Sequence, residues 1–206
     1  MRCEKTTSDA TKHAALRQYV RMIQESGQSL VSKKTLESWE TMWDAHIVDS
    51  LQLAGQVNPG DRVIDVGSGA GFPGVVVAID TVGCDVSVVL VEPRRQRAVF
   101  LQSVVNTLGL NAQITQSAIS RVSMVCDVIT ARAVGTMHWL LRQTEHLVEQ
   151  NPNVRILVIK GTNFLHEITE AQKSGWIFDL SVAPLCKQNG HLLCLSKIKR
   201  TKAQKI

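Results

Sequence analysis

A glycine-rich segment directly follows a short run of β-branched residues in the first third of the chain. The run reaches Asp65, and glycines then occupy positions 67, 69, 71 and 74. Glycine lets the backbone adopt positive φ, and it allows main-chain N–H groups to approach a ligand because no Cβ intervenes. The segment therefore predicts a turn that binds a cofactor at the end of a strand.

Two classes of cofactor fit this turn. Residues 69–74 satisfy the pattern G-x-G-x-x-G, in which a helix N-terminus binds the pyrophosphate of a dinucleotide such as NAD or FAD. The glycines nevertheless begin at Gly67, two positions after an acidic residue. A carboxylate is favourable beside the ammonium group of S-adenosylmethionine, whereas it would repel a diphosphate. We expect S-adenosylmethionine, with a dinucleotide or a purely structural turn as the alternatives.

A second acidic residue, Glu92, ends the next apolar run. A carboxylate at this place meets the ribose hydroxyls of a nucleoside bound over the glycine turn. The alternative is a surface carboxylate that caps the following helix. Both classes of cofactor contain a nucleoside, so Glu92 supports a nucleoside without choosing between them.

Alternating strands and helices position these residues. Strands are predicted at residues 62–66, 86–91, 112–115, 125–130, 154–160, 176–183 and 191–198. Helices are predicted from Pro73 and over residues 93–109, 136–149 and 163–174. The last two strands have no helix between them and should form an antiparallel hairpin. The pattern predicts an α/β fold with a doubly wound, seven-stranded sheet and helices on both faces.

Two amphipathic helical segments precede the sheet. They are expected over residues 8–26 and 35–54, where apolar side chains recur at helical spacing. The sequence Asn-Pro-Gly at residues 58–60 marks the turn into the main domain. We expect residues 1–57 to form a helical extension and residues 58–206 to form one globular domain.

The charge of the chain is concentrated near its end. The net charge is +5, and the 27 residues from Leu180 onward contain six basic residues and no acidic one. A basic tail over residues 197–206 would bind phosphate, because each contact releases counterions from a nucleic acid. The alternative is a solvated terminus.

Composition also limits the compartment and the metal content. The first residues are polar and lack the apolar segment of a signal peptide, and the longest apolar runs are too short to cross a bilayer. We therefore expect a cytoplasmic protein without a membrane partner. The five cysteines are scattered without metal-like spacing, so no metal site is expected.

Several motifs occur in order and at compatible intervals. They are Asp65-Val-Gly-Ser-Gly-Ala-Gly-Phe-Pro-Gly74, Glu92-x-x-x-x-Arg97-x-x-Phe100-Leu101, Thr130-Ala-Arg-Ala133, Lys160-Gly161 and, upstream, His46-x-x-Asp49-Ser50-Leu51. Over nearly the whole chain, this set resembles the RsmG (GidB) family of bacterial 16S rRNA guanine-N7 methyltransferases. The Gly-Phe-Pro-Gly continuation is its most discriminating part. The resemblance implies a class I methyltransferase fold, S-adenosylmethionine as cofactor, and 16S rRNA or the small ribosomal subunit as partner.

The resemblance also implies a set of site residues. Arg132 and Lys160 would orient the guanine through O6 or bind adjacent phosphates. Together with the glycine turn and the second strand, the family pattern gives these cofactor-binding residues: Asp65, Gly67, Gly69, Gly71, Phe72, Glu92, Ile119, Ser120 and Arg132.

The chain departs from the family pattern at three places. Members commonly carry an acidic residue where Ser120 stands, an Arg where Ala45 stands, and a Trp-Asn pair where residues 25–26 are Glu-Ser. The first departure concerns an adenine contact, which a backbone amide at Ser120 can supply. The other two concern substrate docking by the amino-terminal region.

His46, Asp49 and Ser50 lie within one helical turn. Catalytic triads are normally assembled from separate elements of a fold. We expect a structural hydrogen-bonding cluster here.

The expected reaction needs no general base. Guanine N7 carries a free lone pair and no proton, so its attack on a sulfonium methyl group requires alignment alone. Neither an Asn-Pro-Pro-Tyr segment nor a Pro-Cys pair follows the fourth predicted strand. We expect a monomeric enzyme that transfers a methyl group from S-adenosylmethionine to guanine N7. Two alternatives are an oxidoreductase that uses NAD or FAD, and a ribosome-assembly factor that binds S-adenosylmethionine without turnover.

Overall fold

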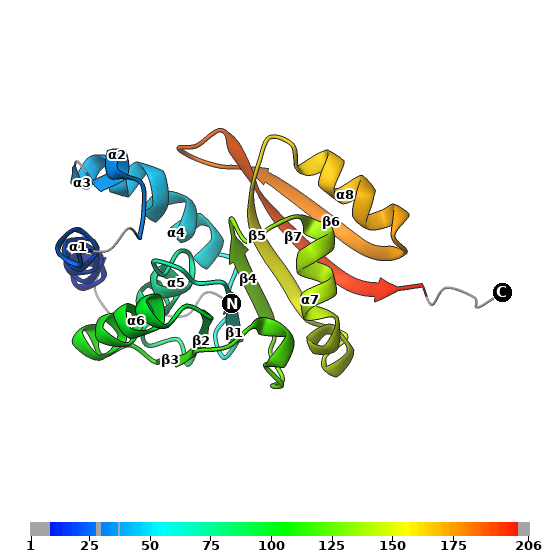
Figure 1. Ribbon diagram of the computed structural model, residues 1–206, viewed down its shortest axis with the longest axis horizontal. Helices are drawn as coiled ribbons and strands as arrows, with labels where there is room; N and C mark the ends of the chain where they lie inside the picture. Colours follow the sequence, from blue (N-terminus) through cyan, green and yellow to red (C-terminus); the bar gives the residue numbers. More distant parts are fainter. Residues whose placement is uncertain (1–8, 28–29, 37, 202–206) are drawn as a thin grey trace.

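A computed structural model describes residues 9–27, 30–36 and 38–201, and its centre is a seven-stranded sheet (Figure 1). The strands are β1 (Arg62–Val66), β2 (Ser87–Val91), β3 (Ala112–Thr115), β4 (Val128–Arg132), β5 (Arg155–Gly161), β6 (Trp176–Pro184) and β7 (Gly190–Arg200). Their order in the sheet is β3-β2-β1-β4-β5-β7-β6. The first five are parallel, whereas β7 runs antiparallel to both β5 and β6. The predicted doubly wound sheet with a final hairpin is confirmed.

Helices cover both faces of the sheet (Figure 1). One face packs against α1 (Asp9–Glu25), α4 (Val48–Ala54), α5 (Gly74–Asp80) and α6 (Arg95–Leu108), and the other against α7 (Met137–Gln150) and α8 (Phe164–Lys173). Successive residues of β1 alternate between the two cores, because side chains of a strand point to opposite faces. Val63 lies in the first core, and Ile64 lies in the second.

The second amino-terminal helix is broken, contrary to the prediction of one helix over residues 35–54. It consists of α2 (Lys33–Leu36), α3 (Trp39–Met42), the π-helical segment η1 (Trp43–Ile47) and α4. Ser38 causes the break, because its backbone is extended and its side chain accepts a hydrogen bond from the Thr41 N–H at 3.1 Å. Such a serine starts a new helix as its N-cap.

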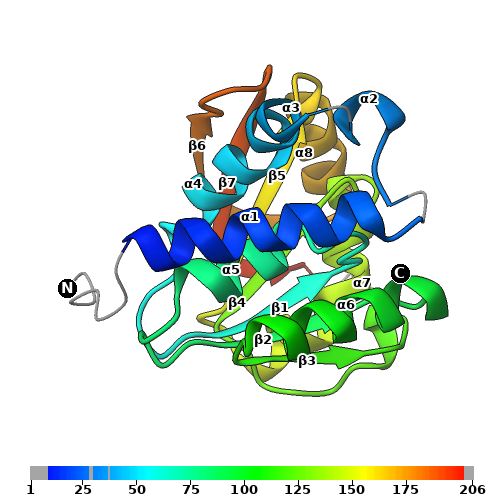
Figure 2. The same ribbon diagram turned by 90° about the vertical axis from the view of Figure 1, so that its left-hand side faces the viewer.

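The first amino-terminal helix, α1, crosses over α5 (Figure 2). Its buried side chains, Leu16, Tyr19 and Ile23 among them, join the core that also holds α5 and α6. No described helix has the length and apolar character that a membrane span requires. The division of the chain at residue 57 stays a prediction.

The fourth strand begins later than predicted. It was expected over residues 125–130 but runs from Val128 to Arg132. Asp127 precedes it. Its carboxylate accepts hydrogen bonds from both the backbone and the guanidinium of Arg62, and its backbone bonds to Arg62 and Arg155. Arg132 is the last residue of β4, whereas the sequence predicts that it lies beyond the end of the strand.

Candidate functional site

The glycine turn is anchored across the ends of β1 and β2 by backbone groups. The N–H groups of Gly67 and Ser68 donate to the carbonyl oxygen of Val91 at 2.8 and 3.1 Å. The Gly69 N–H donates to the carboxylate of Glu92 at 2.9 Å. Gly67 and Gly69 have φ of +65° and +59°, a region that favours glycine. The turn thus has the backbone conformation that its sequence predicted.

Two of the glycines serve packing inside the protein. A Cβ on Gly71 would lie 2.5 Å from the Tyr19 hydroxyl oxygen and 2.6 Å from the Val75 side chain. A Cβ on Gly74 would lie 2.6 Å from Asp65 Oδ2. The Tyr19 hydroxyl donates to the carbonyl oxygen of Ala70 at 2.7 Å, and burial raises the pKa of Tyr19 well above its usual value. Helix α1 therefore holds the turn from behind.

Asp65 lies beneath the glycine turn. It is fully buried, and its Oδ1 accepts a hydrogen bond from the Thr130 hydroxyl at 2.7 Å. Burial raises the pKa of this carboxyl to about 6. Asp65 and Gly71 do not line the three cavities at this edge of the sheet, as far as the described residues define them. Their direct contact with a cofactor stays a prediction.

The first cavity, of about 360 Å³, opens at the ends of β1, β2 and β4. Glu92 lines it, and its two carboxylate oxygens accept from the N–H groups of Gly69 and Arg94. Ile119, in the 3₁₀ turn η2 (Ile119–Arg121), also lines it, whereas the exposed Ser120 does not. The remaining lining residues are Val66, Gly67, Val91, Pro93, Arg94, Arg97, Ser117, Ala118, Ala133, Val134, Trp139 and Gln143.

Sequence reasoning missed two residues of this cavity, Trp139 and Gln143. They are four residues apart on α7 and therefore face the same side of the helix. Trp139 is 39% exposed, although it belongs to a helix with an otherwise buried apolar face. An aromatic residue in the first turn after the fourth strand was the available signal.

The second cavity, of about 270 Å³, lies between the glycine turn and the amino-terminal helices. Phe72 lines it, and the ring of His46 stacks on Phe72 with a centroid distance of 4.6 Å. Burial and the nearby Arg132 guanidinium lower the pKa of His46 to about 4. The other lining residues are Leu30, Val31, Ser32, Thr35, Gly67, Ser68, Gly69, Ala70, Arg97, Arg132 and Ala133.

The expected hydrogen-bonding cluster of His46, Asp49 and Ser50 forms only in part. The Ser50 hydroxyl donates to the carbonyl oxygen of His46 at 2.6 Å. The His46 ring and the Asp49 carboxylate form no hydrogen bond with each other. Instead the ring, which belongs to the π-helical segment, stacks on Phe72.

The third cavity, of about 300 Å³, opens at the ends of β4 and β5 and at the start of β7. Lys160 lines it, and its ammonium group donates to Glu167 Oε2 at 2.6 Å and to the Gly135 carbonyl oxygen. The backbone N–H of Met137 donates to the same carboxylate oxygen at 2.7 Å. The other lining residues are Arg132, Ala133, Gly135, Ile159, Gly161, Glu167, Leu185, Gln188, Asn189 and Gly190.

Arg132 lies on the wall between the second and third cavities. Its Nη2 donates to the carbonyl oxygen of Ala45 at 2.7 Å, and the Gln188 side chain donates to the same oxygen. Its Nη1 is buried and has no hydrogen-bond partner among residues 9–27, 30–36 and 38–201. The side chain of Ala45 departs from the family pattern, but its backbone carbonyl oxygen accepts both of these hydrogen bonds.

The three cavities adjoin one another. The first and second share Gly67, Arg97 and Ala133, and the second and third share Arg132 and Ala133. Ala133 has a φ of +55°, an unusual value for a residue other than glycine. Together they can bind a nucleoside with a charged tail in the first two cavities, and a second molecule in the third.

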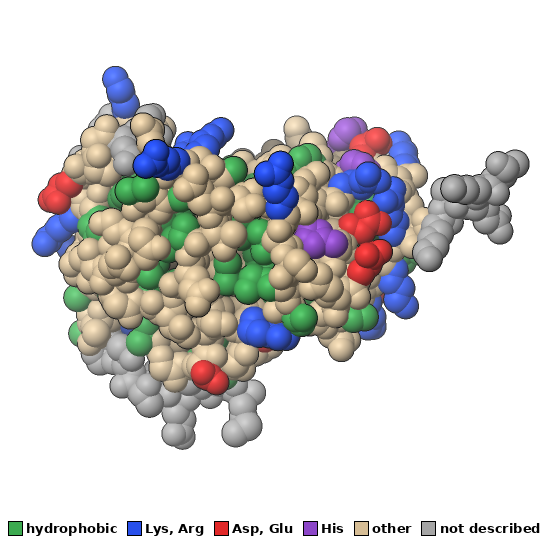
Figure 3. Space-filling view, turned by 60° about the horizontal axis from the view of Figure 1, so that its bottom comes forward, with side chains coloured by type: hydrophobic (Ala, Val, Ile, Leu, Met, Phe, Trp, Pro, Cys, Tyr) green, Lys and Arg blue, Asp and Glu red, His purple; other side chains and the backbone are tan. Residues whose placement is uncertain are grey.

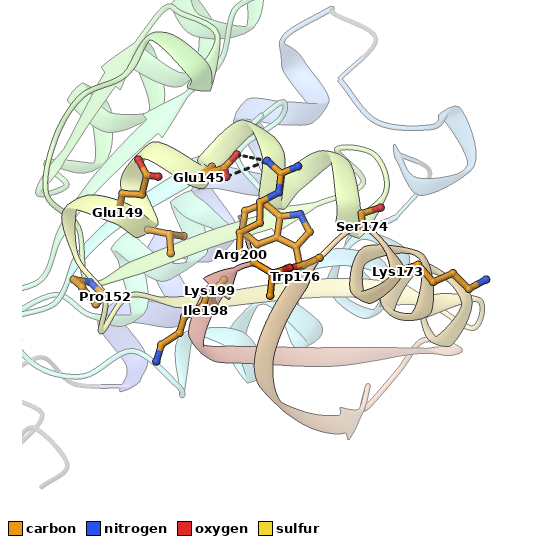
Figure 4. Close-up of a pocket in the computed structure, with 12 residues that line it drawn as sticks. Glu145, Glu149, Pro152, Lys173, Ser174, Trp176, Ile198, Lys199 and Arg200 are labelled. Atoms are coloured by element: carbon orange, nitrogen blue, oxygen red, sulfur yellow. Dashed lines mark hydrogen bonds and ion pairs between the residues drawn. The ribbon is translucent and has the colours of Figure 1, made fainter. Parts of the chain in front are cut away.

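A larger cavity, of about 970 Å³, lies at the opposite edge of the sheet, where β6 begins and β7 ends (Figure 4). Arg200 crosses it and bonds to both carboxylate oxygens of Glu145 at 3.1 Å. None of the predicted site residues lines it. Size alone does not identify the site in this protein.

The model of the GidB family, described as rRNA small subunit methyltransferase G, matches residues 12–193. This chain belongs to that family. A relative from Orientia tsutsugamushi (strain Ikeda) is 35% identical over 144 residues, which are 69% of this chain and 68% of the relative. One from Rickettsia felis is 35% identical over 152 residues, which are 73% of this chain and 74% of the relative. Both are named ribosomal RNA small subunit methyltransferase G.

Solved structures support the fold. A SAM-dependent O-methyltransferase from Thermotoga maritima aligns with a TM-score of 0.60 and 18% identity, over 89% of this chain and 72% of that one. A SAM-dependent methyltransferase from Aquifex aeolicus aligns with a TM-score of 0.60 and 20% identity, over 79% of this chain and 95% of that one. The predicted resemblance and the methyltransferase fold are both confirmed. Membership of the family contradicts the alternative of an oxidoreductase.

Proposed function

We propose that this chain transfers the methyl group of S-adenosylmethionine to N7 of a guanine in 16S rRNA. One observation carries the proposal. In a member of the rRNA methyltransferase G family, a cavity beside the glycine turn adjoins a second binding cavity at Arg132 and Ala133. A methyl donor and an acceptor base bound in these two places would meet at that wall.

The residues present fit S-adenosylmethionine. The first cavity has apolar walls at Val66, Ile119 and Val134 for a purine, and Glu92 lies at the place where ribose hydroxyls are expected. Arg97 borders both the first and the second cavity, where it would meet the carboxylate of the methionine part. When bound, S-adenosylmethionine supplies an electrophilic methyl group.

The acceptor side needs orientation and no proton transfer. Guanine N7 keeps its lone pair at neutral pH, so the protein has only to hold the base in line with the methyl group. Arg132 is fixed through Nη2 by Ala45, and its guanidinium, which lines the third cavity, would donate to O6 beside N7. Lys160 is bound to Glu167 and Gly135, so we assign it the positioning of the segment after β4 in place of a phosphate contact.

The charge distribution supports an RNA substrate. Lys and Arg side chains are spread over one face among hydrophobic side chains, with acidic and histidine side chains mainly toward one end (Figure 3). The terminal basic segment contributes less than its sequence suggested, because β7 extends to Arg200 and three basic residues pair with acids. The pairs are Lys187 with Asp44, Lys197 with Asp179, and Arg200 with Glu145. Lys202 and Lys205 lie outside the described residues.

We propose that a single chain carries out this reaction in the cytoplasm. Residues of this chain form the three adjoining cavities and the wall that they share at Ala133. Light scattering during size-exclusion chromatography should give the mass of one chain, 22.7 kDa. A dimer mass would contradict the monomer.

Mapping the product tests the reaction. Purified protein is incubated with methyl-labelled S-adenosylmethionine and small-subunit particles that lack the modification, and N7-methylguanine is located by reduction and aniline cleavage. We expect one labelled guanine, lost with Arg132→Ala and retained with Arg142→Ala, an exposed arginine on α7. Cofactor binding without label on particles or free rRNA would contradict the proposal and support an assembly factor without turnover.

A further inference from the structure

The third cavity contains an acidic side chain that the family motifs do not include. Glu167 extends from α8 into this cavity, and its side chain is 25% exposed. Its Oε2 accepts from the Lys160 ammonium and from the Met137 N–H. Its Oε1 accepts no hydrogen bond from any side chain or backbone group that the structure describes. One carboxylate oxygen is therefore available to a molecule in the cavity.

The contacts of Oε2 fix the orientation of the carboxylate. Lys160 is 8% exposed, and it is bound in turn to Gly135 in the segment that follows β4. The Met137 N–H belongs to the first residue of α7, so two elements hold the same oxygen. A carboxylate held in this way keeps its second oxygen directed at one place without the entropic cost of ordering a free side chain.

A guanine base offers the matching donors. Its Watson–Crick edge presents the N1–H and N2–H groups side by side, whereas adenine presents an acceptor at N1, which a carboxylate repels. Proteins that bind unstacked bases commonly read this edge by hydrogen bonds. On the basis of the proposed function, we propose that Glu167 reads the Watson–Crick edge of the acceptor guanine and thereby determines specificity for guanine.

The arrangement is consistent with methylation at N7. In guanine, N7 lies on the Hoogsteen edge, away from N1 and N2, and O6 stands between the two edges. Arg132, on the wall shared with the second cavity, lies on the cofactor side of the third cavity, whereas Glu167 comes from the opposite sheet face through α8. A base whose N1 and N2 meet Glu167 directs its O6 and N7 toward Arg132 and the methyl donor. The cavity volume of about 300 Å³ matches the lower end of small-ligand sites.

Substitution of single atoms in the RNA tests this role. Small-subunit particles are assembled with guanosine, inosine or adenosine at the acceptor position; inosine lacks only the N2 amine. Initial rates of methyl transfer are measured for the wild type, Glu167→Gln and the control Glu170→Gln, an exposed acid on the same helix. Glu167→Gln keeps an oxygen that can accept from Lys160 and Met137. Calorimetry with S-adenosylhomocysteine confirms that each variant folds and binds the product cofactor.

We expect inosine to lower the wild-type and Glu170→Gln rates by about tenfold or more, the typical effect of one charge-assisted hydrogen bond. With Glu167→Gln, the guanosine rate should fall, the inosine effect should shrink to about twofold or less, and the ratio of guanosine to adenosine rates should decrease. If inosine lowers the rate equally in all three proteins, the proposed role of Glu167 is overturned, whereas the proposed function stands. Absence of methylation of guanosine particles by the wild type would overturn the proposed function as well.

Discussion

The two halves of the site are built from different materials. The cofactor half, defined as the glycine turn with the ends of β1 and β2, is held mainly by backbone N–H groups. Gly67 there donates to the carbonyl oxygen of Val91, and Gly69 donates to the carboxylate of Glu92. The acceptor half, defined as the ends of β4 and β5 and the start of β7 with α8, is held mainly by charged side chains such as Lys160 and Glu167. The difference teaches that one half depends on backbone conformation and the other on a network of side chains.

Crowding at the glycine turn should produce the largest effect, and it should damage the cofactor half first. Gly71→Ala places a methyl group 2.5 Å from the Tyr19 hydroxyl at a φ of +109°. We expect the free energy of unfolding to fall by about 5 kcal/mol, from backbone strain and overpacking together. Gly109→Ala is the matched control, because its φ is +60° and no atom lies within 4 Å. It should cost about 1 to 2 kcal/mol. Equal losses in urea unfolding would contradict the crowding.

Removal of the Lys160 ammonium should separate the two halves. Lys160→Met leaves the Glu167 carboxylate and the Gly135 carbonyl without their partner, so we expect a loss of about 3 to 4 kcal/mol of stability. Methyl transfer should fall by about tenfold or more, because the Glu167 carboxylate loses the contact that orients it in the third cavity. The affinity for S-adenosylhomocysteine, measured by calorimetry, should change by less than about twofold, since the cofactor half keeps its contacts.

The control for that variant is Lys173→Met, which removes an exposed pair with Glu170 on α8. It should cost less than about 0.5 kcal/mol and leave transfer unchanged. A loss of cofactor affinity in Lys160→Met as large as its loss of transfer would show that the halves are not separable.

Asp65 should make the stability of the cofactor half depend on pH. Burial raises the pKa of this carboxyl to about 6, above its usual 3.8. The folded state then binds the proton more tightly than the unfolded state, so the contribution of this proton is present below about pH 4 and is lost as the pH rises to about 6. The loss is about 3 kcal/mol. Asp65→Asn should remove this loss, which is measured as the difference between the free energies of unfolding in urea at pH 4 and at pH 7. Parallel pH dependence in the two proteins would contradict a raised pKa.

Loss of the Tyr19 hydroxyl should have the smallest effect. Tyr19→Phe removes the hydrogen bond to Ala70 but keeps the ring packed against Phe72. We expect a loss of about 1 kcal/mol of stability and a several-fold weaker affinity for S-adenosylhomocysteine. Glu167 and its partners lie outside this contact, so the ratio of guanosine to inosine rates should not change. A change in that ratio would mean that α1 also controls the acceptor half.

The cofactor half was predictable because its signals are local. Glycines at positions 67 and 69 predict the positive φ values that the structure has there, and the β-branched run before them predicts a strand. The structure places Glu92 and Ile119 on the wall of the first cavity, and their contact with a cofactor stays a prediction. Burial of Asp65 and Gly71 behind the turn was not predictable, since it depends on how α1 packs over residues about 50 positions later in the chain.

The acceptor half was predictable only in part. Arg132 and Lys160 were identified by family motifs, but the bonds that occupy the Lys160 ammonium come from Gly135 and Glu167, which no motif joins to it. Glu167 gives no sequence signal, because an acid in the first turn of a helix usually serves the helix dipole. The break at Ser38 was missed for a similar reason, since an isolated serine only becomes an N-cap once the chain turns there.

A structure determined with S-adenosylhomocysteine bound tests the division into two halves most directly. We predict that the adenosine lies in the first cavity between Glu92 and Ile119, that the sulfur lies in the second cavity next to Ala133, and that the third cavity stays free for the acceptor base. Homocysteine in the third cavity against Lys160 and Glu167, or the ligand in the large cavity beside Arg200, would contradict the account.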